Sequence, residues 1–399
     1  MHFFVSFLVI TFFANPVWAQ DEIMNSYFEK LMAHPDVMQV LADAQEMKEM
    51  STAALGLPDP VLILGVDNVP VDDPSYGRFL PTSKVIGFKQ DIPNGSVREA
   101  QSDRQMELSA KQIILAEFTK NRLKSLFTSM LLKLEKVRTQ QELAENQLVN
   151  YAELETYFKG RLESGDGVYW RFAQVDVERS LIEQQLNDLK SERIEIESAL
   201  INLVGEVPDL KVYTVESEEW KNADDFYPVK IAHKDLEAQA QGVKVAESAY
   251  GSNYSIQAMY KNREEGANFK GDDWFSVQAT FSVPLWYNSN QAPKKRAAQS
   301  KYNAVQYAYE SAKRLWLKNI KSLESKRDAT LKNIHLLVAK DKSFKELSDS
   351  VQRTYESGET SLDNLLTTKI SRLSIQSQLA QKRYMHMSLI SEINSYIGK

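Results

Sequence analysis

The sequence contains no cysteine, and only 15 glycines, 12 prolines and 5 histidines occur among its 399 residues. Without cysteine the chain has no disulfide framework and no thiolate for catalysis or metal binding. The histidines are scattered, and neither a Gly-rich phosphate loop nor a His-Glu-x-x-His motif is present. Because catalysis needs a converging set of nucleophile, base or metal ligands, the sequence predicts a protein that is not an enzyme and uses no cofactor.

Long hydrophobic runs are also missing after the first 19 residues, and no later segment is apolar enough to cross a bilayer as a helix. Residues 1–19 combine an apolar run with Pro16 and the small Ala19, which is typical of a signal peptide cleaved after Ala19, although no Lys or Arg precedes the run. A buried N-terminal strand is the alternative. The formal net charge of -6 does not favour nucleic-acid binding.

Glu, Gln, Lys, Leu and Ala dominate long tracts, a composition typical of long helices. Leu123, Met130 and Val137 lie on a seam with coiled-coil spacing. The pattern predicts two helices of about 62 residues, each roughly 93 Å long at 1.5 Å per residue. The expected helices span residues 34–55, 97–158, 166–204, 233–250, 293–355 and 362–397.

The stretch from Trp274 to Ser282 alternates between apolar and polar side chains, as a two-faced strand does. Its length of about 10 residues fits a tilted strand that crosses a bilayer, and aromatic residues flank it at both ends. Its apolar face, which we expect to contact lipid, consists of Phe275, Val277, Ala279, Phe281 and Val283. An edge strand of a soluble sheet is the alternative for this stretch taken alone. Further strands are expected at about 61–68, 83–92 and 253–262, with the last at about 273–283.

The same order of elements occurs twice, at an offset of about 193 residues, which indicates a duplication rather than a solenoid. We expect a first repeat over 20–205 with a helix–helix tip at about 159–167, and a connector over 206–232 with a strand-like stretch from Lys211 to Val215. The second repeat spans 233–399 and has its tip at about 354–360. His34-Pro35-Asp36 is expected to begin one helix, and His233-Lys234-Asp235 its counterpart.

Four strands with one lipid-facing side cannot close a membrane barrel, which needs about eight or more. An open sheet edge is not tolerated in lipid, so other subunits must complete the sheet. A homotrimer would supply twelve strands and a ring of helices that encloses a tunnel.

This arrangement resembles the TolC family of outer-membrane efflux proteins over essentially the whole mature chain. The residues that carry the resemblance are His34-Pro35-Asp36, Leu57-Pro58-Asp59-Pro60, Val66-Asp67-Asn68, Gln90-Asp91-Ile92-Pro93, Phe281-Ser282-Val283-Pro284-Leu285 and the two Glu-Ser-Gly tips. The Leu-Pro-Asp-Pro and Asp-Asn-Val-Pro runs look most like the heavy-metal, CzcC-like branch.

The resemblance implies an α+β membrane protein: a trimeric 12-stranded outer-membrane β-barrel continuous with a long α-helical periplasmic tunnel. Its implied partners are a periplasmic adaptor and an inner-membrane pump, of the RND type in that branch. The implied function is a passive exit duct for efflux, with heavy-metal ions among the candidate substrates. Alternatives are the exit duct of a type I protein secretion system and, in another class, a soluble periplasmic coiled-coil adaptor.

The resemblance also implies that adaptors dock at the two tips. These comprise Glu163, Ser164, Gly165 and Asp166 in the first repeat and Glu356, Ser357, Gly358 and Glu359 in the second. Family members carry acidic residues just after this glycine, at the periplasmic constriction. Here Asp363 is the nearest match, whereas Thr367 replaces a second acidic residue. The candidate gate residues are Asp363, Glu359, Arg171 and Arg353, and Asp363 is expected either to hold a cation or to pair with Arg171.

Several methionines raise the question of a soft-metal site. Met385-His386-Met387 could hold Cu(I) or Ag(I), together with further methionines in the first helices. Methionines at helical spacing more often fill the seams between helices, so no metal site is predicted. The additional candidates are Met24, Met32, Met38, Met47 and Met50.

Overall fold

The structure is a computed structural model that describes residues 16–72, 74–79, 81–210, 214–266 and 268–398. Most of the expected signal peptide therefore lies outside the described residues, as do positions 211–213 of the strand-like stretch expected in the connector. The helices are α1 (Pro16–Met32), α2 (Pro35–Leu55), α3 (Gly95–Glu163), α4 (Tyr169–Val204), α5 (Tyr227–Ser248), α6 (Gln291–Glu356) and α7 (Leu362–Tyr396), with a short 3-10 helix η1 (Ala223–Asp225). The strands are β1 (Val61–Asp67), β2 (Ser83–Ile92), β3 (Tyr254–Asn262) and β4 (Trp274–Phe281).

The two long helices are slightly longer than the sequence pattern predicts. α3 has 69 residues and α6 has 66. Asn94 accepts a hydrogen bond from the Ser96 N–H at 2.9 Å, which satisfies a free donor at the start of α3. The expected end of this helix at residue 158 is wrong, because α3 continues through Gly160 to Glu163 and a single glycine costs a helix only about 1 kcal/mol.

Two helix starts differ from the sequence prediction. α5 begins at Tyr227 rather than at His233, because Pro228 fits the first turn of a helix and its missing N–H has no partner to lose there. The helix α1 was not predicted at all, since its residues were assigned partly to the signal peptide.

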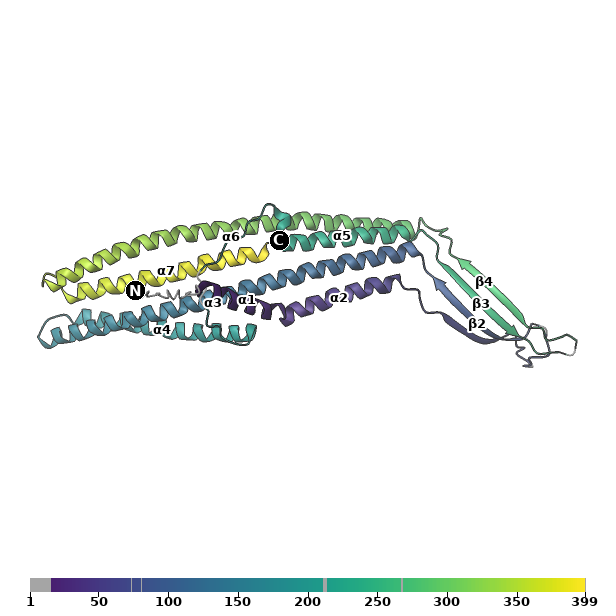
Figure 1. Cartoon of the computed structure of the whole chain (residues 1–399), viewed down its shortest axis with the longest axis horizontal. Helices are drawn as coiled ribbons and strands as arrows, with labels where there is room; N and C mark the ends of the chain where they lie inside the picture. The colour runs from purple at the N-terminus through teal and green to yellow at the C-terminus, as the bar shows by residue number, and fades with distance from the viewer. Residues whose placement is uncertain (1–15, 73, 80, 211–213, 267, 399) are drawn as a thin grey trace, which may run out of the picture. The chain divides into compact units, whose positions relative to one another are not determined.

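The four strands form one antiparallel sheet in the order β1-β2-β3-β4, as Figure 1 shows for the last three. Phe88 lies opposite Ala258, and Ala258 lies opposite Val277. Residues directly opposite each other on neighbouring strands point to the same side of a sheet, so this register defines two continuous faces. The strand β4 ends at Phe281, so Val283 lies just beyond the strand in which it was expected.

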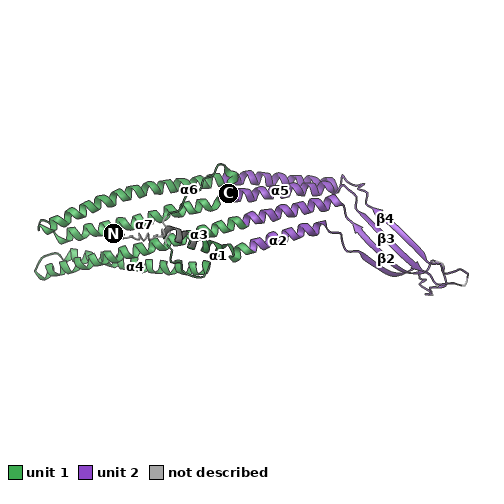
Figure 2. Ribbon diagram, in the orientation of Figure 1, with its two compact units in different colours: residues 1–38, 116–226, 316–399 green, residues 39–115, 227–315 purple. Residues whose placement is uncertain are grey.

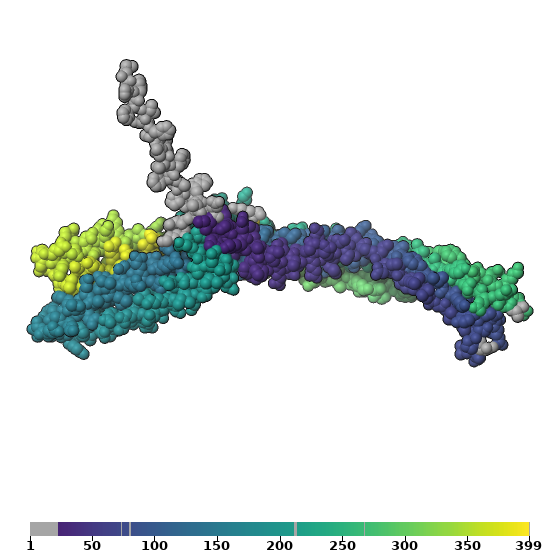
Figure 3. Space-filling model, turned by 60° about the horizontal axis from the view of Figure 1, so that its bottom comes forward, coloured from purple at the N-terminus to yellow at the C-terminus, as the bar shows by residue number. Residues whose placement is uncertain are grey.

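The chain forms two compact units, and each takes segments from both halves of the sequence (Figure 2). Unit 1 comprises residues 1–38, 116–226 and 316–399, and unit 2 comprises residues 39–115 and 227–315. In unit 1 the C-terminal part of α3 lies beside α4, and the C-terminal part of α6 lies beside α7 (Figures 1 and 3). In unit 2 the sheet lies at one end of the helices (Figure 2). The helix α2 lies on the face that Figure 3 shows.

The core of unit 1 also holds the end of the connector in place. Phe226 is completely buried and forms a β-bridge with Ile397, and the Gly398 N–H donates to the Asp225 carbonyl at 2.8 Å. The side chain of Asn394 accepts from the Glu218 N–H at 2.9 Å and donates to the Glu216 carbonyl at 2.6 Å. The connector is therefore attached to the C-terminal end of α7.

Candidate functional site

One face of the sheet is apolar and exposed across all four strands. Its exposed members are Leu62, Leu64 and Val66 in β1, Ile86 and Phe88 in β2, Tyr254, Ile256 and Tyr260 in β3, and Phe275, Val277 and Phe281 in β4. Exposure is high even in the inner strands, at 51% for Ile86 and 48% for Ile256. A contiguous apolar surface of this extent marks a site that another protein or a membrane covers.

The opposite face of the sheet is polar and better covered at β2, where Ser83 and Val85 are buried. Ser255 and Thr280 share a hydrogen bond of 2.6 Å across β3 and β4 on this face. Lys261 donates to Asp67 at 2.6 Å. A soluble sheet usually buries its apolar face and exposes its polar one. Here the apolar face is the exposed one, and the described residues do not cover it.

The two helix–helix tips have the same backbone geometry. Gly165 and Gly358 have positive φ angles of 93° and 79°, the left-handed conformation that glycine adopts without strain. Each follows a helix as a Schellman C-cap: the Asp166 N–H donates to the Arg161 carbonyl at 3.0 Å, and the Glu359 N–H donates to the Thr354 carbonyl at 2.9 Å. The duplicated sequence thus gives duplicated turns, at the positions that the tetrapeptide repeat predicted.

The side chains of the tips differ between the two copies. In the first tip Arg161 Nε donates to Asp166 Oδ2 at 2.7 Å, which fixes the acidic side chain against the end of α3. Glu163 and Glu356 end their helices and are exposed. The serines behave alike in the two tips. Ser164 and Ser357 each donate the side-chain hydroxyl to a carbonyl of the preceding turn, at 2.8 and 3.0 Å.

A hydrophobic cluster lies next to the tips in unit 1. It consists of Tyr151, Leu154 and Phe158 of α3, Val175 of α4 and Leu366 of α7. Packed against it are the partly buried Tyr157, Val168, Phe172, Ile182, Leu362 and Ile370. The cluster therefore joins three helices, and it fixes the positions from which α4 and α7 direct their first-turn side chains.

Two of the candidate gate residues meet beside this cluster. Arg171 Nη2 lies 2.8 Å from Asp363 Oδ1, and their side chains are only 16% and 26% exposed. The same Nη2 lies 3.2 Å from Thr367 Oγ1, and the Arg171 guanidinium lies over the Phe158 ring at 5.9 Å. The hydrogen bond with Asp363 raises the pKa of Arg171 above its ordinary value, despite an opposing effect of burial.

With side chains only 16% and 26% exposed, this pair is less exposed than typical surface ion pairs, which contribute about 0–1 kcal/mol. The other two gate candidates do not join it. Neither Glu359 nor Arg353 takes part in any of the ion pairs of the described residues.

Nothing in the sequence pointed to Phe158 and Tyr151 as neighbours of the pair. Burial, and next the Glu178 charge, raises the pKa of Tyr151 to about 12, so this phenol is neutral at physiological pH.

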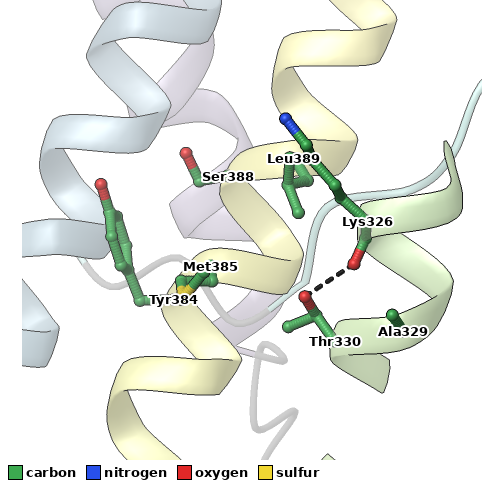
Figure 4. Close-up of a pocket in the computed structure, with 7 residues that line it drawn as sticks. All are labelled: Lys326, Ala329, Thr330, Tyr384, Met385, Ser388 and Leu389. Atoms are coloured by element: carbon green, nitrogen blue, oxygen red, sulfur yellow. Dashed lines mark hydrogen bonds between the residues drawn. The ribbon is translucent and has the colours of Figure 1, made fainter. Parts of the chain in front are cut away.

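A pocket of about 400 Å³ lies between α6 and α7 (Figure 4). Lys326, Ala329 and Thr330 line it from α6, and Tyr384, Met385, Ser388 and Leu389 line it from α7. Thr330 donates its hydroxyl to the Lys326 carbonyl at 2.7 Å. One thioether beside a lysine does not make a site for Cu(I) or Ag(I), which prefer several soft ligands.

The neighbouring His386 is one of the residues that were considered as metal ligands, and it does not line this pocket. Burial, and next the positive charge of Arg327, lowers the pKa of His386 below its ordinary value. In the part of the chain that the structure describes, no group of three or more His, Asp or Glu residues is arranged to hold a metal ion. The same described residues include no helix long and apolar enough to cross a membrane.

Comparison with models of protein families finds no match, and comparison with curated protein sequences finds none either. Solved structures do match. The outer membrane protein VceC of Vibrio cholerae is 16% identical with a TM-score of 0.72, over 94% of this chain and 97% of that one. The MtrE outer membrane channel of Neisseria gonorrhoeae, in its open state, is 14% identical with a TM-score of 0.77, over 94% and 88%.

The CmeC outer membrane channel of Campylobacter jejuni is 13% identical with a TM-score of 0.74, over 95% of this chain and 87% of that one. Identities this low carry no information on substrates or partners. The match extends over nearly the whole of both chains in each case, so the long helices and the sheet are shared together. The chain has the fold of an outer membrane channel.

Proposed function

We propose that this protein is the outer-membrane exit duct of a tripartite efflux system and belongs to the TolC family. The observation that carries the proposal is the exposed apolar face that runs across β1 to β4 opposite a polar face. The match to the solved outer membrane channels VceC, CmeC and MtrE supports it. A soluble coiled-coil adaptor would expose this apolar face to water, which is unfavourable.

The functional unit in this proposal is a homotrimer. In one chain β1 and β4 are the edges of a four-stranded sheet, and an open edge in lipid leaves backbone N–H and C=O groups without partners. Three copies supply twelve strands, so that β4 of one copy pairs with β1 of the next and the barrel closes. The polar faces then line an aqueous lumen, as in other large membrane barrels.

The helices continue the lumen as a periplasmic tunnel, and the two tips receive a periplasmic adaptor. The duplicated Schellman turns at Gly165 and Gly358 support this part of the proposal, since they present two similar docking surfaces per chain. An inner-membrane pump, of the RND type in the branch that the sequence resembles, supplies substrate through the adaptor. The duct itself is passive, and heavy-metal ions are among its candidate substrates.

The proposal is tested on the full-length protein expressed with its own N-terminal segment. Membranes are separated on a density gradient, and the purified protein is then added to planar lipid bilayers. We expect the mature chain, beginning at Gln20, in the outer-membrane fraction, extractable only with detergent, as a trimer that forms discrete conducting channels. A monomer in the soluble periplasmic fraction that forms no channels would contradict the proposal.

A further inference from the structure

The two junctions that lead from the sheet into the long helices differ, although the chain is duplicated. Between β2 and α3 only Pro93 and Asn94 intervene. Between β4 and α6 lies the longer loop of residues 282–290, which includes an extra turn from Leu285 to Asn290. We call residues 282–296, this loop with the first turn of α6, the β4–α6 junction.

The extra turn is held together by its own backbone. The Ser289 and Asn290 N–H groups both donate to the Trp286 carbonyl at 3.1 Å, and the Ala292 N–H donates to the Tyr287 carbonyl at 2.8 Å. This fixed turn nevertheless exposes its largest apolar side chains, with Leu285 at 68% and Trp286 at 75%. An ordered turn that displays Leu and Trp to solvent indicates a surface on which something else lies.

The apolar side chains continue the exposed face of the sheet. Phe281 at the end of β4 and Val283 just after it are exposed, and Leu285 and Trp286 follow directly. If the sheet face contacts lipid, these residues lie where the lipid region ends on the helix side. Tryptophan is enriched at that depth because its ring is apolar and its indole N–H can still hydrogen-bond.

The charge beside this turn has a single sign. From Trp274 to Tyr309 the sequence contains no Asp or Glu, and its basic residues are Lys294, Lys295, Arg296 and Lys301. Lys295 Nζ lies 3.1 Å from Glu247, whereas the exposed Lys294 and Arg296 form no ion pair with any residue that the structure describes. The corresponding start of α3 carries both signs, with Glu99 close to Arg98.

The position of these cations is unfavourable for the helix itself. They occupy the first turn or two of α6, where the helix dipole favours acidic side chains, and that first turn has none. Lys294 and Arg296 break this local rule without a compensating ion pair among the described residues, and such a conflict points to a binding function. The sign of the charge requires an anionic partner, and the adjacent Leu285 and Trp286 require one with an apolar part.

We infer that the β4–α6 junction binds anionic phospholipid at the membrane surface on the helix side. Trp286 and Leu285 insert beside the acyl chains. Lys294 and Arg296, which have no ion-pair partner among the described residues, contact the phosphate headgroups, and Lys295, paired with Glu247, adds to the positive charge beside them. This inference rests on the proposed function, because it requires the apolar face of the sheet to lie in a membrane. It goes beyond that function by assigning a lipid class to one of the two junctions and not to the other.

The experiment measures how well brominated lipids quench Trp286 in the reconstituted, full-length protein. The emission of Trp286 is obtained by subtracting the fluorescence spectrum of Trp286→Phe from that of the parent protein. Bilayers contain brominated lipid with either a phosphatidylglycerol or a phosphatidylcholine headgroup in a background of unbrominated lipid. We expect phosphatidylglycerol to be preferred by about fivefold at low salt, the effect of roughly one cation near an anionic surface, and the preference to fall as salt is added.

The variant Lys294→Gln/Lys295→Gln/Arg296→Gln should lose this preference and still insert. The matched control, Lys332→Gln/Lys342→Gln/Lys345→Gln, removes three exposed charges from the same helix and should keep the preference. Equal quenching by both lipids in the inserted parent, or a preference that survives in the first variant, would overturn the inference and leave the proposed function standing.

Two further outcomes are also decisive. If the first variant keeps its lipid preference but no longer sediments with purified peptidoglycan sacculi, the cations serve the cell wall and the inference is wrong. If the parent does not insert into either bilayer, the proposed function fails and this inference fails with it.

Discussion

Asp363 on α7 and Arg171 on α4 meet through a hydrogen-bonded ion pair of 2.8 Å, although 192 positions separate them in the sequence. Both side chains are partly buried, and the Arg171 guanidinium lies over the Phe158 ring. The pair connects the first turns of two helices that belong to different halves of the duplication. In the proposed trimer this contact would occur three times near the periplasmic end of the tunnel. It is therefore the contact by which we expect the tunnel to be held closed.

Breaking this pair should open the tunnel. Arg171→Ala and Asp363→Ala should each raise single-channel conductance in planar bilayers, because a hydrogen bond between charged groups contributes about 1.5–3 kcal/mol. Arg171→Ala should also increase block by divalent cations, since it leaves the Asp363 carboxylates without a partner. The charge-exchanged protein Arg171→Asp/Asp363→Arg should recover low conductance. If all of these variants conduct like the parent, the gate lies elsewhere.

The two faces of β4 should respond differently to charge. Val277→Arg places a guanidinium on the apolar face at mid-strand, which costs about 2–4 kcal/mol in a bilayer. Ser276→Arg is the matched control, because its side chain points to the polar face and reaches water. Unfolding in urea from reconstituted membranes measures both. Equal losses of stability in the two variants would show that the faces are assigned incorrectly.

The tip glycines should be needed for docking but not for assembly. Their positive φ angles strain a β-branched residue, and open space surrounds both positions, so Gly165→Val/Gly358→Val should distort the turns without a steric clash in the core. Adaptor cross-linking and efflux should be lost, while trimers and channel conductance remain. Gly160→Ala is the control, because it lies inside α3 and should preserve efflux. Full efflux in the double variant would refute adaptor docking at these turns.

Glu192 on α4 should make part of the stability depend on pH. Burial by itself raises the pKa of Glu192, but hydrogen bonds from Lys136 and Lys133 outweigh burial and leave the pKa below its ordinary value of 4.5. The unfolded state therefore binds the proton more tightly. The stabilisation is present above pH 4.5 and is lost as the pH falls through the lower pKa of the folded state.

Glu192→Gln should accordingly cost about 1–3 kcal/mol at pH 7, and its difference from the parent should shrink below pH 4.5. The exposed Glu195 lies on the same helix, so Glu195→Gln is a suitable control with little expected effect. Chemical unfolding across pH 3–7 measures both differences. A loss in Glu192→Gln that is the same at every pH would contradict the assignment.

Much of the local structure could be read from the sequence, because it depends on short-range periodicity. Alternation identified β4 and its apolar face, and the repeated Glu-Ser-Gly marked two turns that both need a left-handed glycine. Helix ends were predicted less well. Pro228 was not recognised as part of the start of α5, and the first long helix was expected to end at residue 158 although α3 continues to Glu163.

The sequence by itself determined the duplicated order of elements, the two-faced strands and the glycine turns, since each follows from the side chains of a few consecutive residues. It also proposed two states for Asp363, with a cation or with Arg171, and had no means to choose. Only the tertiary structure shows that Asp363 meets Arg171, because this contact depends on how the cluster around Phe158 packs α4 against α7. Cation binding by Asp363 stays a prediction. The same holds for the sheet: alternation predicted an apolar face on β4, but pairing in register was required to extend it across all four strands.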